Sequence, residues 1–148
     1  VRALLAGRSQ EVRRTVDRWL EDFAAHRVAP RVFARTETLQ ESLDAYRERV
    51  AAGARPPAAP YELAIASGRA VQPGDQLSYY VAGRTAGVAV NEYARLARDW
   101  DPARPDENVE YYQAKVREVW ERFRAFTEFD GLRPYADEPE PQSQLSLF

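Results

Sequence analysis

The sequence predicts an α+β fold that is mostly helical, with a small strand-bearing part and a flexible C-terminal tail. Apolar residues recur at helical spacing near both ends of the chain, and an alternating apolar pattern follows a proline-glycine turn in the middle. A proline- and acid-rich stretch closes the sequence. With 148 residues and 45% hydrophobic content, the chain can bury one modest core.

The first predicted helix follows Ser9, a plausible N-cap, and ends near His26. Its apolar face consists of Val12, Val16, Trp19, Leu20 and Phe23. The β-branched and aromatic run "RVFART", from Arg31 to Thr36, predicts a strand or extended segment. Helical periodicity returns in "ESLDAYRERVAAG", where Gly53 is placed as a C-terminal cap. We therefore assign residues 1–53 to a helical region.

A strand-bearing insertion is predicted at about residues 60–105, after the rigid connector "ARPPAAP". "YELAIASGR" reads as a short helix that Gly68 stops. Pro73 and Gly74 stand where a type II turn requires them, and the strand after the turn places Leu77, Tyr79 and Val81 on one side. Beyond it, "GVAV" favours a second strand and "EYARLARDW" a helical turn or two.

The last predicted helix covers about residues 106–127, with an acidic start at Asp106, Glu107 and Asn108. Its apolar stripe is wide, and consists of Val109, Tyr112, Val116, Val119, Trp120, Phe123 and Phe126. Residues 130–148 lack the apolar content that folding requires, so we expect a flexible tail.

Charge gives a weak indication of a partner. The 21 basic and 23 acidic residues leave a net charge of −2, but the stretch from Val1 to Arg69 holds 12 basic and 9 acidic residues. A polyanion should therefore meet the first half of the chain. The side chains of Arg35, Thr36 and Arg69, which flank the extended segment and the short helix, are suited to hold a phosphate backbone without reading bases.

Signals for catalysis are weak. The chain has no cysteine, and the only histidine, His26, sits at a predicted helix end where a solvent-facing cap is the usual role. Asp99 and Asp101 have no further acidic cluster or histidine to complete a metal shell. We interpret the chain as a binding module without a catalytic site of its own. No stretch is long and apolar enough for a membrane helix, and we expect a cytoplasmic protein without a membrane partner.

The last residues, "QLSLF", carry large apolar side chains on an acidic tether. Such a segment resembles a docking peptide, in which a few apolar anchors enter a groove and a glutamine amide binds at its rim. The alternative is that Leu147 and Phe148 fold back onto their own domain.

Three segments in order carry a resemblance to a known family: "RVFARTETLQESLDAY", "YELAIASGRAVQPGDQLSYYVAG" and "DENVEYYQAKVREVWERF". The order resembles the C-terminal region of family B DNA polymerases, where such segments build the thumb. The most specific part is "ASGRAVQPGDQLSYYV" followed by "VEYYQAKV". The chain end is similar to that of the bacterial DNA polymerase II branch of the family, whose terminal peptide binds the sliding clamp. Its counterparts here are Gln144, Leu145, Ser146, Leu147 and Phe148.

The resemblance implies a thumb domain over residues 1–129, followed by the tail with its clamp-binding peptide at residues 144–148. Its implied partners are primer-template duplex DNA, the sliding clamp, and the palm, fingers and exonuclease domains upstream of Val1. The family's catalytic residues match nothing here, so no catalytic residue, metal site or cofactor is assigned to this chain. Magnesium is expected in the upstream palm domain. The chain starts at Val1 and contains no methionine, so we expect it to be part of a longer protein.

Two alternatives remain open. The chain is a non-catalytic adaptor, or the small subunit of a split polymerase, that binds clamp and DNA; or it is a helical interaction module with an accidental terminal peptide. A continuous reading frame with palm motifs upstream of Val1 favours the thumb, and a nearby start codon favours the adaptor. A helical interaction module predicts no affinity for either clamp or duplex.

Overall fold

The computed structural model describes residues 2–84 and 86–130, with side chains between residues 7 and 125. The chain divides into two compact units. Residues 2–27 and 109–130 form the helical unit, and Val28–Asn108 form the sheet unit. About 53% of the structure is helical, and the strands form one three-stranded antiparallel sheet. The predicted mostly helical α+β class is confirmed.

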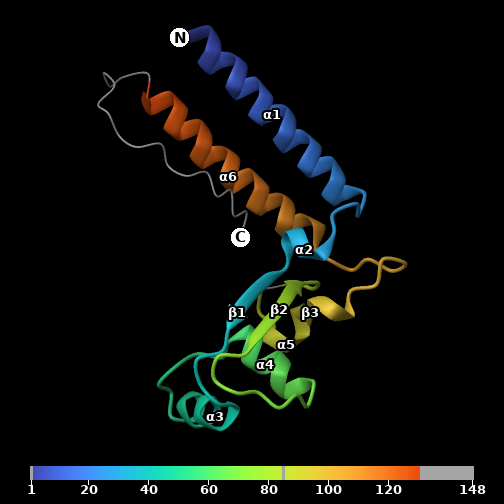
Figure 1. Cartoon of the computed structure of the whole chain (residues 1–148), viewed down its shortest axis with the longest axis vertical. Helices are drawn as coiled ribbons and strands as arrows, with labels where there is room; N and C mark the ends of the chain where they lie inside the picture. The colour runs from blue at the N-terminus through green and yellow to red at the C-terminus, as the bar shows by residue number, and fades with distance from the viewer. Residues whose placement is uncertain (1, 85, 131–148) are drawn as a thin grey trace. The chain divides into compact units, whose positions relative to one another are not determined.

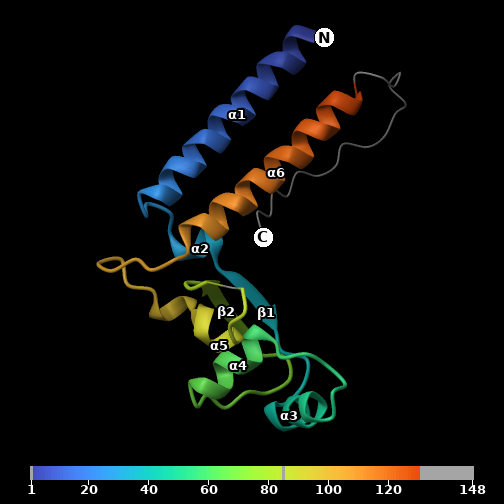
Figure 2. The same ribbon diagram turned by 180° about the vertical axis from the view of Figure 1, so that it is seen from behind.

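The helical unit is a pair of helices, α1 (Arg2–Ala24) and α6 (Val109–Asp130), which lie side by side in both views (Figures 1 and 2). The ring of Phe23 stacks on Tyr112 with centroids 5.6 Å apart, and the Gln113 amide donates to the Leu20 carbonyl at 3.0 Å. Phe23, Tyr112 and Val116 are buried, whereas the other described members of both predicted apolar stripes are half-buried. The pattern therefore identified the packed faces of both helices.

The start of α1 differs from the prediction, whereas its end near His26 is confirmed. Helix α1 begins at Arg2, so Ser9 lies inside the helix and does not cap it. The residues before Ser9 are mainly arginine, alanine and leucine, which are strong helix formers. At the other end His26 adopts a left-handed φ of 54°. The amides of His26 and Arg27 bond back to the carbonyls of Phe23 and Asp22, which is the Schellman arrangement.

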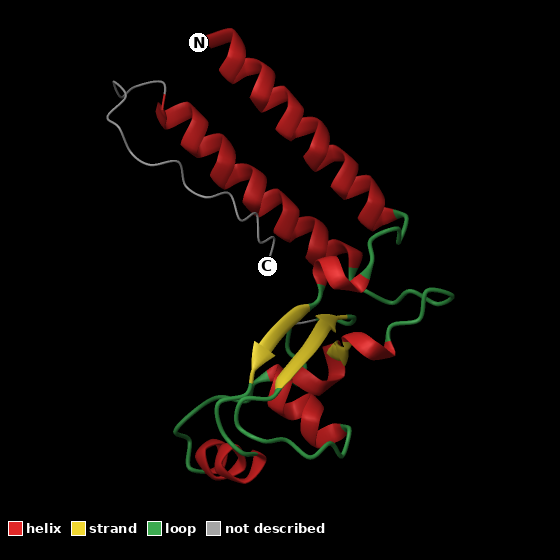
Figure 3. Cartoon of the chain, viewed as in Figure 1, coloured by secondary structure: helices red, strands yellow, loops and turns green. Residues whose placement is uncertain are grey.

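The sheet unit contains helices α2 (Pro30–Phe33), α3 (Leu43–Ala51), α4 (Ala59–Ala66) and α5 (Val90–Tyr93), and the 3₁₀ turn η1 (Ala97–Asp99). Its strands are β1 (Arg35–Thr38), β2 (Gln76–Val81) and β3 (Ala94–Leu96), shown in yellow in Figure 3. The strand order is β1-β2-β3. In register, Thr36 lies opposite Ser78, and Tyr80 opposite Arg95.

This unit is wider than the predicted insertion of residues 60–105. It includes β1 and α3, which the sequence had assigned to a helical region covering residues 1–53. The reason is long-range pairing: β1 bonds to β2 across about forty residues of sequence, and no local pattern reveals such a partner. Residues 106–108 also belong to this unit, so α6 starts three residues later than predicted.

Short elements account for the other differences. In "RVFART" the first part is α2 and only Arg35 and Thr36 belong to a strand, because Pro30 at the first helical position favours a helical turn. The predicted strand "GVAV" is wrong, since Gly87 has a φ of 73° in a turn and Val90 begins α5. The third strand lies instead within "EYARLARDW", between α5 and η1.

The core of the sheet unit lies between α4 and one face of the sheet. Leu63 and Ala64 of α4 pack with three strand residues, which are Leu77, Ala94 and Leu96. On the opposite face, Tyr80 is buried. The ring of Phe33 lies edge-on to Tyr80 with centroids 5.7 Å apart, and the ring of Trp100 lies edge-on to Phe33 with centroids 6.4 Å apart. The sequence predicted the first face but missed the second.

The predicted turn chemistry is confirmed. Gly53 and Gly68 follow the ends of α3 and α4 with φ values of 69° and 67°, as glycines that end helices do. At the turn before β2, Gly74 has a φ of 97° and the Asp75 amide donates to the Gln72 carbonyl at 3.1 Å. That combination defines the expected type II turn.

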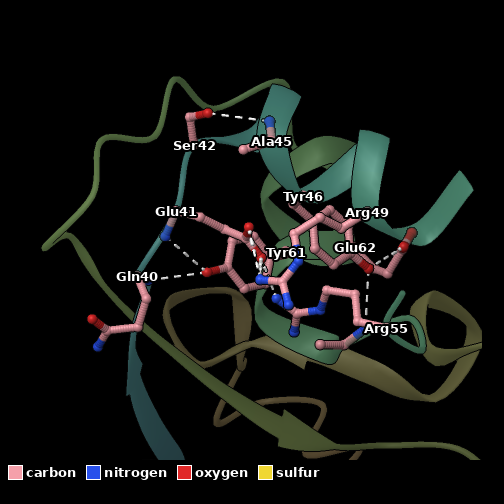
Figure 4. Close-up of polar contacts among 10 residues, drawn as sticks. Gln40, Glu41, Ser42, Ala45, Tyr46, Arg49, Arg55, Tyr61 and Glu62 are labelled. Atoms are coloured by element: carbon pink, nitrogen blue, oxygen red, sulfur yellow. Dashed lines mark hydrogen bonds and ion pairs between the residues drawn. The ribbon is translucent and has the colours of Figure 1, made fainter. Parts of the chain in front are cut away.

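A polar cluster holds the connector between α3 and α4 (Figure 4). The rings of Tyr46 and Tyr61 stack with centroids 4.4 Å apart. The Arg55 guanidinium carbon is 5.0 Å from each centroid, within the range of a cation–π contact with both rings. Arg55 bonds to Glu41, which also pairs with Arg49 at 3.2 Å.

The tyrosine hydroxyls of this cluster bind backbone as well. Tyr61 accepts from the amides of Gln40 and Glu41, at 3.0 and 3.2 Å. Tyr46 accepts from the Ala58 amide and donates to Glu62. Two buried rings thus fix the chain on both sides of α3, although the connector itself contains prolines that lack amide donors.

Candidate nucleic-acid interface

The sequence singled out Arg35 and Thr36 together, but strand geometry separates them. Successive residues of a strand point to opposite faces, so Arg35 shares the face of its partner Tyr79, and Thr36 that of Ser78. Arg35 is therefore on the α4 side of the sheet, together with Leu77, whereas Thr36 is on the other side. The side chains of Arg35 and Thr36 would therefore face different phosphates of a ligand.

Arg35 is already paired. Its Nε lies 2.8 Å from Glu37 Oε1, and the same carboxylate oxygen accepts a hydrogen bond from the Tyr79 hydroxyl at 2.9 Å. The Arg35 side chain is 66% exposed, so the ion pair is screened by water and contributes at most about 1 kcal/mol. Such a pair can open for a phosphate, but in this structure the charge of Arg35 is balanced.

Arg69 lies in a different place, directly after α4. Its amide donates to the Ala64 carbonyl at 3.2 Å, which completes the bonds that end the helix after Gly68. Its side chain is exposed and has no ion-pair partner among the described residues. The backbone position of Arg69 is therefore fixed while its guanidinium remains available to an anion.

Thr36 belongs to a row of uncharged polar side chains. Its Oγ1 lies 2.6 Å from the Ser78 hydroxyl, and the neighbouring pair in register is Thr38 and Gln76. Ser78 is half-buried and the other three are exposed. Because one hydroxyl of a bonded pair keeps its own proton free, this row offers donors to a ligand.

The same sheet face carries an arginine that the sequence did not single out. Arg95 of β3 is in register with Tyr80, and its Nε lies 3.0 Å from Asp106 Oδ2. The Tyr80 hydroxyl donates to the other oxygen, Oδ1, at 2.5 Å. Burial and the Asp106 hydrogen bond raise the pKa of Tyr80, so the hydroxyl keeps its proton and continues to donate.

A signal for Arg95 was present in the sequence. "ARL" alternates apolar, charged and apolar residues, which is the pattern of a strand with one solvent-facing arginine. Three residues are too few to be recognised without knowledge of the partner strand.

Glu107 and Asn108, which follow Asp106, also form hydrogen bonds within the sheet unit. Glu107 is 3% exposed and accepts a hydrogen bond from the Trp100 indole at 2.7 Å. The Asn108 amide group donates to the Gly83 carbonyl, and its backbone amide to Val81. The three residues predicted as a helix start thus hold the chain against the sheet before α6 begins.

Within residues 2–84 and 86–130, no three histidine, cysteine or acidic side chains come together as a metal site would require, Asp99 and Asp101 included. None of the helices described is both long enough and apolar enough to span a bilayer.

The predicted clamp-binding peptide, residues 144–148, lies outside the described residues, as does the tail from residue 131. The sequence matches no protein-family model, and the comparison with curated proteins finds no match.

Proposed function

We propose that the chain is the thumb region of a family B DNA-directed DNA polymerase. In this role it holds the primer-template duplex behind the active site and tethers the enzyme to the sliding clamp. The catalytic residues of that enzyme, and the magnesium ions they bind, belong to its palm domain and not to this chain.

One observation carries the proposal. The resemblance requires an extended segment, then a helix that runs into a proline-glycine turn and a tyrosine-rich strand, and finally a helix beginning near "YY". The corresponding elements are β1, then α4 with the Gln72–Asp75 turn and β2, and then α6. This order of elements, with α2 in place of the first part of the extended segment, is the support for the proposal.

For the duplex, we propose non-specific contacts through Arg35, Thr36 and Arg69. Phosphate contacts of this kind position a protein on DNA but do not read sequence. The sheet unit holds 10 arginines and 11 acidic residues, so it is close to neutral, and its grip would rest on a few phosphates.

For the clamp, the proposed anchors are Leu145, Leu147 and Phe148, with Gln144 at the rim of the groove and Ser146 at the variable position. If two or three apolar side chains are buried at roughly 1.5–3 kcal/mol each, ordering costs leave an affinity on the order of micromolar. This suffices because clamp and thumb share one DNA, so the second contact is effectively intramolecular.

The clamp test compares the parent chain with a truncation that lacks residues 144–148. We expect the truncation to lose binding to an immobilised bacterial clamp while its circular dichroism and duplex binding stay unchanged. Gln144→Ala should weaken clamp binding, whereas the matched variant Gln142→Ala should not, since Gln142 lies outside the peptide. Unaltered clamp affinity in the truncation would end the proposed tether.

The duplex test measures retention of a fluorescent primer-template at several salt concentrations. Arg35→Ala and Arg69→Ala should each reduce the dependence of affinity on salt without changing sequence preference. A parent chain that binds neither duplex nor clamp would support the reading as a helical interaction module. The upstream reading frame distinguishes a thumb from a separately encoded adaptor.

A further inference from the structure

One face of the sheet gathers five hydrogen-bonding side chains, which we call the polar sheet face: Thr36, Thr38, Gln76, Ser78 and Arg95. All are on the side opposite α4, since Leu77, between Gln76 and Ser78, packs against that helix. Four of the five are exposed and Ser78 is half-buried. Tyr80 lies on the same face but is buried against Phe33, so only part of the face meets water, and polarity alone does not indicate a ligand.

The arrangement of Arg95 is the additional observation. A guanidinium has five N–H donors, and only the one on Nε is used by Asp106. The donors on its two Nη atoms have no partner among the described residues. Asp106 is itself held by the Tyr80 hydroxyl at 2.5 Å, and the Tyr80 ring is buried. Arg95 is therefore oriented before any ligand arrives, which lowers the entropic cost of binding.

The charges on this face do not oppose an anion, since Arg95 and Asp106 balance each other. Glu37 points to the α4 side with Arg35, so it does not contribute to the polar sheet face. Asp106 is the one carboxylate close to Arg95 in the contacts described; its Oδ1 accepts the Tyr80 hydrogen bond and its Oδ2 lies 3.0 Å from Arg95 Nε. The exposed Nη edge of Arg95 and the hydroxyls of Thr36 and Ser78 are thus donors without a competing free carboxylate in their row.

Spacing suits an extended ligand. Neighbouring strands are about 4.8 Å apart, and alternate residues of one strand about 6.6–6.8 Å apart, so the five side chains cover a strip and not a point. Serine, threonine and glutamine side chains contact phosphate oxygens in nucleic-acid complexes, with arginine supplying charge. A polyanion with repeated phosphates fits a strip better than a single small anion does.

We propose that the polar sheet face binds the sugar-phosphate backbone of the duplex, with Arg95 as its main phosphate contact and Asp106 as a positioning residue. This inference rests on the proposed duplex binding, and it extends the expected contacts from Thr36 across the sheet. Arg95 shares the face of Thr36, whereas Arg35 is on the other face.

The experiment measures duplex affinity against salt concentration for Arg95→Gln, Arg95→Lys and Arg47→Gln. Arg47 is the matched control, because it is an exposed arginine of the same unit that pairs with Asp44 on α3. We expect Arg95→Gln to weaken binding roughly tenfold and to lower the salt slope by about one. Arg95→Lys should keep the slope but lose part of the affinity, and Arg47→Gln should match the parent.

The hydroxyls are tested by Thr36→Val with Ser78→Ala, which should weaken binding several-fold without lowering the salt slope, since no charge is removed. A second measurement needs no variant: arginine modification by a glyoxal reagent, followed by peptide mapping, should show Arg95 protected by duplex and Arg47 unprotected. This readout is decisive if an Arg95 variant fails to fold.

The outcomes separate the two proposals. If the parent binds duplex but Arg95 is unprotected and Arg95→Gln behaves like Arg47→Gln, the polar sheet face is not the contact surface and duplex binding lies elsewhere. If the parent shows no salt-dependent binding to duplex, the proposed function fails and this inference with it. Protection of Arg95 together with the lower salt slope supports both.

Discussion

Replacing Tyr61 by phenylalanine removes one hydroxyl from the polar cluster of the sheet unit and leaves the ring in place. Tyr61 is 5% exposed, and its ring stacks on Tyr46 at 4.4 Å, a contact that phenylalanine retains. The lost atom is the acceptor for the amides of Gln40 and Glu41 (Figure 4). The substitution therefore removes the contacts of the hydroxyl, those to the two amides and that to the Arg55 side chain, and keeps the packing of the ring.

The magnitude follows from the surroundings of the two amides. A net contribution of about 1 kcal/mol per hydrogen bond, with a larger penalty for a buried donor left unpaired, sets the scale. Gln40 is exposed and Glu41 half-buried, so water can reach at least one of the amides. We expect Tyr61→Phe to lower the free energy of unfolding of the sheet unit by about 1–2 kcal/mol, which corresponds to a melting temperature lower by roughly 4–15 °C.

The assay is urea unfolding combined with hydrogen exchange. The amides of Gln40 and Glu41 should exchange faster in Tyr61→Phe, while those of α6 in the helical unit should not change. Tyr79→Phe is the control, because its hydroxyl donates to the Glu37 carboxylate, far from the amides of Gln40 and Glu41 in the hydrogen-bond pattern. Equal exchange rates at Gln40 and Glu41 in Tyr61→Phe and the parent would refute the reasoning.

Three further predictions concern strain and pH. His26→Gly should raise the free energy of unfolding by about 0.5–1 kcal/mol in thermal unfolding, because glycine adopts the left-handed φ of 54° without strain. Gly53→Ala should lower the free energy of unfolding, because it places a side chain at a φ of 69°. A change of the same sign in both variants would contradict this reasoning. Partial burial alone would raise the pKa of Glu41, but hydrogen bonds and charge from Arg55 and Arg49 lower this pKa below 4.5. The ion pairs of Glu41 therefore stabilise the fold above that pH, and this stabilisation is lost as pH falls through the folded pKa. Glu41→Gln should be less stable at neutral pH and show a flatter acid dependence, and an unchanged acid unfolding profile would count against the ion pairs. Burial and the hydrogen bond to Asp106 raise the pKa of Tyr80 above 10.0, so the protonated hydroxyl stabilises the fold below that pH and this stabilisation is lost as pH rises further. Tyr80→Phe should flatten the alkaline unfolding curve. An unaltered curve would argue against this hydrogen bond.

Prediction from sequence succeeded where the determinants are local. The two long helices, the glycine stops after α3 and α4, and the turn at Pro73 and Gly74 follow from helical periodicity and backbone conformation. It failed where partners are distant. The register of β1 on β2, the short strand β3, and the burial of Tyr80 under Phe33 and Trp100 depend on contacts between segments remote in sequence.

The candidate site shows the same division. Sequence alone indicated Thr36 from its place in an extended segment, and the strand places that residue on the polar sheet face. It also joined Arg35 to Thr36 because they are neighbours, although a strand sends neighbours to opposite faces. Arg95 was not recognised, since its orientation comes from Asp106 and Tyr80, which only the folded chain brings together.

By itself, the sequence determined the α+β class, the packed faces of α1 and α6, and the glycine and proline turns, because each depends on a few consecutive residues and their backbone preferences. The tertiary structure decided which segments share a sheet, where the boundary between the two units falls, and which arginines are paired or available. Those properties depend on strand register and on contacts between segments remote in sequence. Because side chains alternate along a strand, a shift of the register by one residue would turn each side chain to the opposite face of the sheet.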